Sequence, residues 1–313
     1  MPHEDRISAL LKESGIIKGD IHFSPVAAGF SCAVKLFCNN QYFIKYANTS
    51  TIDSEGMNQC RNEYAFYEKY AGKLDFLPEV VYQTANDNEV LLVLKKYETI
   101  PPHRWDKALL QQAVEICTRI NALDCTAYSA FSWLETENEP GRYSLQESCD
   151  NWMRLHKKFP DNIDAKVLDN MHNDFYKIAK YSEELTIPNT FCHGDFAPDQ
   201  LLLDGARLLV CDWAYTHYGK GIGAVAYFCV RGIDQKLPID RDALIAYYSE
   251  ALHNHTGISV APELLVQYVN VSEWLVAFRY YAEYLQDADR SRAIGSYKDM
   301  VETYMALQHK AHW

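Results

Sequence analysis

Two carboxylates and one amide stand around a short predicted hairpin in the middle of this chain. Asp195 and Gln200 come before the apolar run 201–203, and Asp212 follows the apolar run 208–210. Carboxylate and amide oxygens are ligands that Mg²⁺ accepts, and a carboxylate that holds no metal can take a proton as a general base. If the hairpin brings these side chains together, they predict a site for a hard cation with a base beside it.

The turn of this hairpin is expected at Asp204-Gly205, because this dipeptide between apolar runs is the strongest short signal for a two-residue turn. Such a turn would return Asp212 to the loop that carries Asp195. The pairs that it predicts across the hairpin are Leu203 with Ala206, Gln200 with Leu209, and Ala197 with Asp212.

The segment HGDFAPDQLL…LLVCDW resembles the catalytic loop and metal-binding strand of the aminoglycoside phosphotransferase and choline kinase family. These enzymes are small-molecule relatives of the protein kinases. The family pattern is His-Gly-Asp, an Asn five residues after that Asp, and a hydrophobic strand that ends in Asp. The resemblance implies that Asp195 is the catalytic base and that Asp212 is the main Mg²⁺ ligand. It also places Gln200, which stands where Asn is usual, as a second ligand.

The N-terminal third carries further residues that the resemblance assigns to a nucleotide. Lys45 follows an apolar strand, and Glu63 lies on the predicted helix 54–71. In the family such a pair steadies the phosphates, since an ammonium held by a carboxylate stays charged and fixed. The turn between the first two strands, with Gly29, Phe30 and Ser31, is expected to cover the phosphates through its backbone N–H groups.

The chain changes character between residue 95 and Pro102, and we place the boundary between two lobes in this stretch, after residue 98. Pro101-Pro102 ends regular structure. Residues 1–98 are expected to form the nucleotide-binding lobe, and residues 99–313 the catalytic and substrate-binding lobe. The resemblance implies that the backbone of the connecting region, from Lys95 to Tyr97, binds adenine.

The predicted fold class is α+β, a bilobal protein kinase-like fold with a small β-rich N-terminal lobe and a larger, mainly helical C-terminal lobe. Strands are expected within 21–46, 79–82 and 89–94, and a short leading helix over 5–14. The periodicity of apolar residues predicts the helices of the second lobe. They are 105–123, 143–159, 165–185, 221–230, 241–253, 262–285 and 291–308.

Composition limits the partners. The 313 residues carry a net charge of −12, which disfavours nucleic acid and suits a cationic ligand, although the total does not say where the charges sit. No apolar run is long enough for a membrane helix, so no membrane partner is expected. The first six residues lack the pattern of a signal peptide, and nine cysteines without a Cys-x-x-Cys indicate free thiols. We therefore expect a cytoplasmic protein, and the sequence does not indicate its oligomeric state.

The resemblance implies transfer of the γ-phosphoryl group from ATP or GTP, with Mg²⁺, to a hydroxyl of a small molecule. Aminoglycoside-like antibiotics are the first candidate acceptors, which would make the protein an antibiotic-resistance kinase. Choline-like alcohols, macrolides and sugar-like metabolites remain alternatives. The alternative from another class is a catalytically weak nucleotide-binding pseudokinase, motivated by Gln200 and by the absence of acids in 219–224. A protein kinase is disfavoured, since the chain has no Asp-Phe-Gly and no His-Arg-Asp.

Overall fold

A computed structural model describes residues 2–26, 33–126, 128, 131–134 and 144–310. The chain forms two compact units. The first comprises residues 1–116, 193–216 and 235–238, and the second comprises residues 117–192, 217–234 and 239–313. The segment that carries Asp195, Gln200 and Asp212 therefore groups with the N-terminal unit, while the expected boundary after residue 98 stays a prediction.

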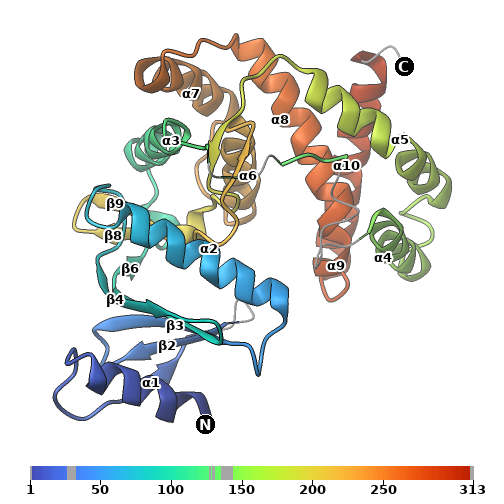
Figure 1. Ribbon diagram of the computed structural model, residues 1–313. Helices are drawn as coiled ribbons and strands as arrows, with labels where there is room; N and C mark the ends of the chain where they lie inside the picture. The colour runs from blue at the N-terminus through green and yellow to red at the C-terminus, as the bar shows by residue number, and fades with distance from the viewer. Residues whose placement is uncertain (1, 27–32, 127, 129–130, 135–143, 311–313) are drawn as a thin grey trace. The chain divides into compact units, whose positions relative to one another are not determined.

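The first unit is built on a five-stranded antiparallel sheet with the order β1-β2-β3-β5-β4 (Figure 1). The central strands are the most apolar, and β5 is buried at every position but its last. The strands are β1 (Phe23–Pro25), β2 (Val34–Cys38), β3 (Tyr42–Asn48), β4 (Val80–Ala85) and β5 (Glu89–Lys95).

Two helices cover opposite faces of this sheet, α1 (Pro2–Glu13) and α2 (Ser54–Tyr70) (Figure 1). Because side chains alternate along a strand, Ile44 packs with α1 and Ala47 packs with α2. Lys45 shares the face of Ala47, so the alternation directs its side chain towards α2. The side chain of Asp53 accepts a hydrogen bond from the Gly56 N–H (2.8 Å), which fixes where α2 begins.

A second, three-stranded sheet of the first unit holds the central hairpin. Its order is β6-β8-β9, with β6 (Glu98–Thr99), β8 (Leu201–Asp204) and β9 (Arg207–Val210). A short 3₁₀ turn, Pro198–Gln200, leads into β8.

The hairpin exists as expected, but its predicted register was wrong by two residues. Asp204 pairs with Arg207, so Gly205 and the residue after it form the turn. Gly205 has a φ of 66°, and the Asp204 carboxylate forms an ion pair with Arg207 across the turn. The aspartate is therefore the last strand residue, which the dipeptide signal alone did not reveal. The shift places Gln200 beside Cys211, whose N–H donates to the Gln200 carbonyl (3.0 Å).

The second unit is mainly helical. It has a two-stranded sheet of β7 (Thr190–Cys192) and β10 (His217–Gly219). The helix α3 (Lys107–Asn121) begins in the first unit and ends in the second. The other helices are α4 (Leu145–Lys158), α5 (Ala165–Glu184), α6 (Ile222–Asp234), α7 (Arg241–Thr256), α8 (Pro262–Val276), α9 (Ala282–Tyr284) and α10 (Arg290–Lys310).

The single helix expected over 262–285 is interrupted by a π-helical segment, Ala277–Tyr281. Side chains of α4 bind the backbone carbonyls in this segment: Trp152 Nε1 donates to the Phe278 carbonyl (2.9 Å), and Ser148 Oγ donates to the Arg279 carbonyl (2.8 Å). These outside donors replace part of the regular helical pattern, which is how a wider turn is satisfied. Periodicity along one helix cannot reveal donors on another.

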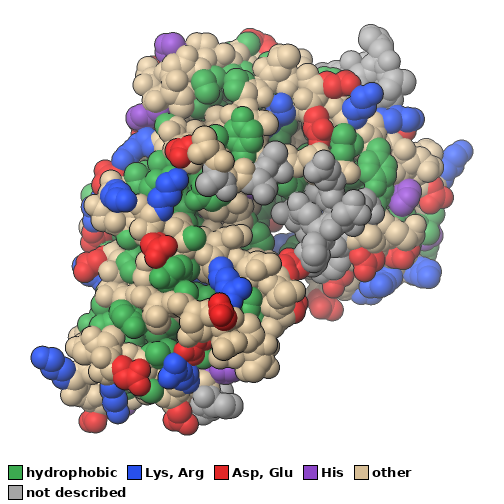
Figure 2. All heavy atoms as spheres, in the orientation of Figure 1, with side chains coloured by type: hydrophobic (Ala, Val, Ile, Leu, Met, Phe, Trp, Pro, Cys, Tyr) green, Lys and Arg blue, Asp and Glu red, His purple; other side chains and the backbone are tan. Residues whose placement is uncertain are grey.

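The described part of the chain has no helix that is long and apolar enough to cross a membrane. Its eight cysteines are free thiols, and six of them are buried. On the face drawn in Figure 2, acidic and basic side chains are interspersed. On this face, the acidic excess of the sequence is not gathered into one patch.

Candidate functional site

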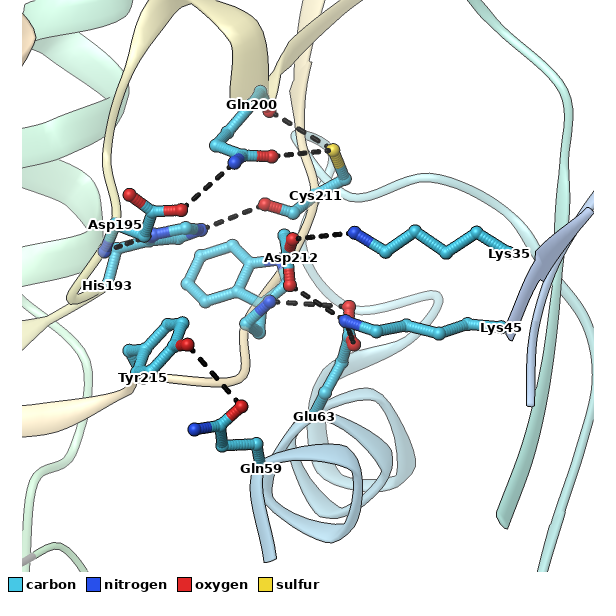
Figure 3. A network of polar contacts seen from close by, with 11 residues as sticks. Lys35, Lys45, Gln59, Glu63, His193, Asp195, Gln200, Cys211, Asp212 and Tyr215 are labelled. Carbon is cyan, nitrogen blue, oxygen red and sulfur yellow. Dashed lines mark hydrogen bonds and ion pairs between the residues drawn. The ribbon is translucent and has the colours of Figure 1, made fainter. Parts of the chain in front are cut away.

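The loop that carries Asp195 is held by a buried histidine ring. The Asp195 N–H donates to His193 Nδ1 (3.2 Å), which places the proton of a neutral imidazole on Nε2. His193 Nε2 in turn donates to the Cys211 carbonyl (3.0 Å) (Figure 3). The ring therefore ties the loop before β8 to the end of β9.

Gly194 allows this loop to approach the backbone that follows Asp212. Its φ is 88°, and a Cβ at this position would lie 2.0 Å from the Tyr215 carbonyl oxygen. No rotamer change can relieve a clash with backbone. Any larger residue would therefore displace the loop on which Asp195 stands.

We expect Gly194→Ala to destabilise the first unit by about 3 kcal/mol and to reduce activity strongly, because backbone strain and a clash add. Gly205→Ala is the matched control: its φ is 66°, but nothing lies within 4 Å of an added Cβ. The control should cost only about 1 kcal/mol. Urea unfolding of both variants measures the difference, and equal losses would show that the Tyr215 contact does not matter.

A buried cluster of charges joins β3, α2 and Asp212 in the segment that follows β9. Lys45 Nζ lies 2.6 Å from Glu63 Oε2 and 2.8 Å from Asp212 Oδ1 (Figure 3). Lys45 and Glu63 are only 5% and 3% exposed. Three segments that are far apart in the sequence thus meet through one ammonium group.

The cluster keeps Lys45 and Asp212 charged. Burial alone would lower the pKa of Lys45, but Glu63 and Asp212 outweigh it, and the pKa is raised. Burial alone would raise the pKa of Asp212, but Lys45 and Lys35 lower it to about 2. Since this value lies below the ordinary value of about 3.9, any stability that Asp212 contributes is present above about pH 4 and is lost progressively as pH falls from there through about 2. Asp212 is therefore a carboxylate at neutral pH.

Asp212 adopts a left-handed backbone conformation, with a φ of 65°. A residue with a Cβ is strained there by about 1 kcal/mol, and such strain is concentrated at functional sites. The contacts of its carboxylate with Lys45 and Lys35 offset this cost.

Lys35 is a member of the cluster that sequence reasoning missed. Its Nζ lies 3.6 Å from Asp212 Oδ2, and its side chain is 19% exposed. Lys35 pairs directly with Lys45 across β2 and β3, so the two ammonium groups leave the same face of the sheet. The sequence could have revealed this pairing, since both lysines stand five residues from Asn40, which lies in the turn between these strands.

Trp213 fixes the end of β9 against α2 and was also missed. Its ring stacks on Phe66 with centroids 3.8 Å apart, and its backbone N–H donates to Glu63 Oε1 (3.3 Å). Burial raises the pKa of Glu63, and the Lys45 ammonium opposes this rise. Glu63 thus receives hydrogen bonds from Lys45 and from the backbone after Asp212.

Gln200 lies beside Asp195. Its Nε2 donates to Asp195 Oδ2 (2.9 Å), and its Oε1 is 3.8 Å from Cys211 Sγ (Figure 3). Its expected role as a metal ligand stays a prediction.

The other predicted nucleotide contacts divide into two groups. Gly29, Phe30 and Ser31 lie outside the described residues. In the connecting region, the Lys95 N–H donates to the Glu79 carbonyl (3.0 Å) and the Lys96 N–H to the Gln41 carbonyl (2.8 Å). Both donors are used within the unit, and adenine binding by this region stays a prediction.

The segment 219–224, which has no acidic residue, is held in place by hydrogen bonds from Lys220. In the second unit, Lys220 Nζ donates to the Leu185 and Ile187 carbonyls at 2.8 and 3.0 Å. A Cβ on Gly221 would meet Asn121 Nδ2 at 2.4 Å. This segment is thus closely packed without the acidic residues.

The donor set around Asp212 suits Mg²⁺. Mg²⁺ in phosphoryl-transfer sites is usually held by one or two carboxylates, with phosphates and waters as its other ligands. Asp212 is ionised and its side chain is 18% exposed. The described residues contain no group of three or more His, Cys, Asp or Glu side chains that could enclose a metal alone. The arrangement therefore fits a metal that arrives with a phosphorylated ligand.

Residues 24–256 match the model of the phosphotransferase enzyme family. A search of curated proteins finds no match.

Solved structures match over nearly the whole chain. A choline kinase from Cryptosporidium parvum has a TM-score of 0.66 at 10% identity, covering 98% of this chain and 97% of that one. A GDP complex of an aminoglycoside 2′-phosphotransferase has a TM-score of 0.63 at 11% identity, covering 96% of this chain and 97% of that one. A putative aminoglycoside phosphotransferase from Ralstonia eutropha has a TM-score of 0.56 at 15% identity, covering 98% of each chain.

These matches confirm the predicted α+β, kinase-like fold class, and the family model covers residues 24–256, more than half of the chain. The chain therefore belongs to the phosphotransferase enzyme family.

Proposed function

We propose that this protein transfers the γ-phosphoryl group of ATP or GTP to a hydroxyl group of a small molecule. The observation that carries the proposal is the cluster of Lys45, Glu63 and Asp212 in one unit with the Asp195 loop. Each residue matches a position of the family pattern, and the cluster supplies what a loose phosphoryl-transfer transition state requires, namely fixed charges and a positioned base.

The residues divide the work as follows. Lys45, fixed by Glu63, contacts the phosphate oxygens of the donor, and Asp195 orients the acceptor hydroxyl and takes its proton. Asp212 would hold Mg²⁺, which when bound neutralises charge on the phosphates. His193 and Gly194 keep the Asp195 loop in place.

The acceptor is the open part of the proposal. The similar structures include a kanamycin complex and a streptomycin complex of aminoglycoside phosphotransferases, and choline kinases. Kanamycin, streptomycin and choline are cations, and the net charge of −12 favours a cationic acceptor here. We therefore rank aminoglycosides first, then choline-like alcohols, then macrolides and sugars.

An acceptor screen tests the proposal. Release of ADP or GDP is measured with Mg²⁺ and each nucleotide against aminoglycosides, choline-like alcohols, macrolides and sugars. We expect release that depends on one class of acceptor. Nucleotide binding without turnover on any acceptor would favour the pseudokinase alternative, and no nucleotide binding would contradict both.

Lys35→Met is expected to weaken nucleotide binding about tenfold, because it removes one of two ammonium groups that would face the phosphates. A factor of ten corresponds to about 1.4 kcal/mol, a reasonable value for one partly buried charge. Lys18→Met, an exposed position, is the control with the same change of charge. Equilibrium titration with ATP measures both, and an affinity equal to that of the control variant would remove Lys35 from the site.

A further inference from the structure

The amide of Gln200 points its two ends at two different partners. Nε2 donates to Asp195 Oδ2 at 2.9 Å. Oε1 faces Cys211 Sγ at 3.8 Å, and the same sulfur is 3.3 Å from the Gln200 backbone carbonyl (Figure 3). The side chain thus bridges the Asp195 loop and the end of β9.

The chemistry of the partners fixes which end is which. An ionised carboxylate only accepts hydrogen bonds, so the NH₂ end of the amide has to face Asp195. The oxygen end then faces the thiol, which is a weak donor. Reversing the amide would set two acceptors against each other at Asp195.

The orientation of the amide gives the Gln200 oxygen different neighbours from the Asp212 oxygens. A metal is bound by the oxygen of an amide and not by its nitrogen. The Asp212 oxygens face Lys45 and Lys35, whereas the Gln200 oxygen faces Cys211. The amide oxygen of Gln200 is thus directed at the thiol, while its NH₂ end is bound to Asp195.

We propose that Gln200 is a positioning residue for Asp195 and not a metal ligand. This inference rests on the proposed function, and it replaces the ligand role expected from the sequence. The backbone of Asp195 is fixed by His193, and its carboxylate is fixed by Gln200. Asp212 is then the only one of the predicted metal ligands that serves the metal.

The first test reads metal binding without turnover. The affinity for ATP is measured with and without Mn²⁺ for the wild type, for Gln200→Met and for the exposed control Gln146→Met. We expect the gain in affinity from Mn²⁺ to agree within about twofold in all three. A tenfold or greater loss of this gain in Gln200→Met alone would show that Gln200 is a ligand and overturn the proposal.

The second test measures kcat and KM to ask whether Gln200 positions the Asp195 carboxylate. Gln200→Met should lower kcat about thirtyfold and leave the KM for nucleotide unchanged, since the bond to Asp195 acts on the base. Gln200→Glu should lower kcat at least as much, because a second carboxylate would repel Asp195. If Gln200 were a metal ligand, Gln200→Glu would instead bind Mn²⁺ and ATP more tightly than the wild type, because a carboxylate is a stronger ligand than an amide.

A double variant separates positioning from a general loss of structure. In the Asp195→Asn background, Gln200→Met should have no further effect on kcat, because residues that act as a unit are non-additive. Multiplying effects would contradict the inference. If the wild type transfers phosphate to no acceptor, the proposed function fails, and slow ATP hydrolysis and the Mn²⁺ titration still decide between the two roles of Gln200.

Discussion

Asp195→Asn is expected to lower turnover about a thousandfold while nucleotide affinity stays nearly unchanged. Asparagine keeps the size of the side chain and an oxygen that can accept from Gln200 Nε2, but it cannot take a proton at neutral pH. General base catalysis by a positioned carboxylate contributes ~10²–10⁴-fold, which sets the size of the effect. Steady-state kinetics on the acceptor found by the screen and nucleotide titration provide the two readouts.

Asp199→Asn is the matched control for this prediction. Asp199 stands in the same loop, it is exposed, and it accepts a hydrogen bond from Gln235 (3.4 Å). The same substitution there should leave kcat within about twofold, as expected for a surface position. An equal loss of nucleotide affinity and turnover in Asp195→Asn would count against the assignment of the base.

Lys45→Met is expected to have the second-largest effect, and it should act on both stability and catalysis. Glu63 would be left without its closest ionic partner in a site where it is only 3% exposed. Breaking one side of a buried ion pair typically costs about 3 kcal/mol. The loss of the ammonium should also lower kcat/KM at least a hundredfold, because the phosphates lose a fixed positive charge.

A second substitution separates the two effects of Lys45→Met. Glu63→Gln removes the unpaired charge and keeps an oxygen that can accept from the Trp213 N–H. The double variant should recover much of the lost free energy of unfolding but none of the lost kcat/KM. Urea unfolding and kinetics of the four proteins test this. Recovery of activity in the double variant would show that Lys45 serves the fold alone.

The sequence was sufficient to predict the fold class and the pairing of Lys45 with Glu63. The resemblance to the kinase family supplied the pairing, and local period-two and period-3.6 patterns placed Lys45 at a strand and Glu63 on a helix. The return of Asp212 to the loop that carries Asp195 also followed from the hairpin, since any hairpin in this stretch brings the end of β9 back to the loop before β8.

The register of the hairpin could not be predicted because two turns compete within three residues. Asp204-Gly205 carries the stronger local signal, but the pairing of Asp204 with Arg207 and the positive φ of Gly205 favour the turn one residue later. This shift of one residue in the turn moves the cross-strand partner of Gln200 from Leu209 to Cys211. It explains why the contacts of Gln200 were not foreseen.

Contacts between segments that are distant in the chain could also not be predicted from the sequence. The stacking of Trp213 on Phe66 and the approach of Lys35 to Asp212 depend on three-dimensional packing of the sheet, α2 and the end of β9. Each residue alone has a more common interpretation, as a core aromatic or as a solvated strand lysine. Only their joint position at the cluster gives them a role.

The most direct test of phosphoryl transfer follows the γ-phosphorus itself. ATP labelled with ¹⁸O at the terminal γ-oxygens is incubated with the protein, Mg²⁺ and the acceptor, and the products are analysed by mass spectrometry. We predict that the labelled phosphoryl group appears on a hydroxyl oxygen of the acceptor, and that Asp195→Asn abolishes this product. Label that appears only in inorganic phosphate, at equal rates in both proteins, would contradict the proposed function.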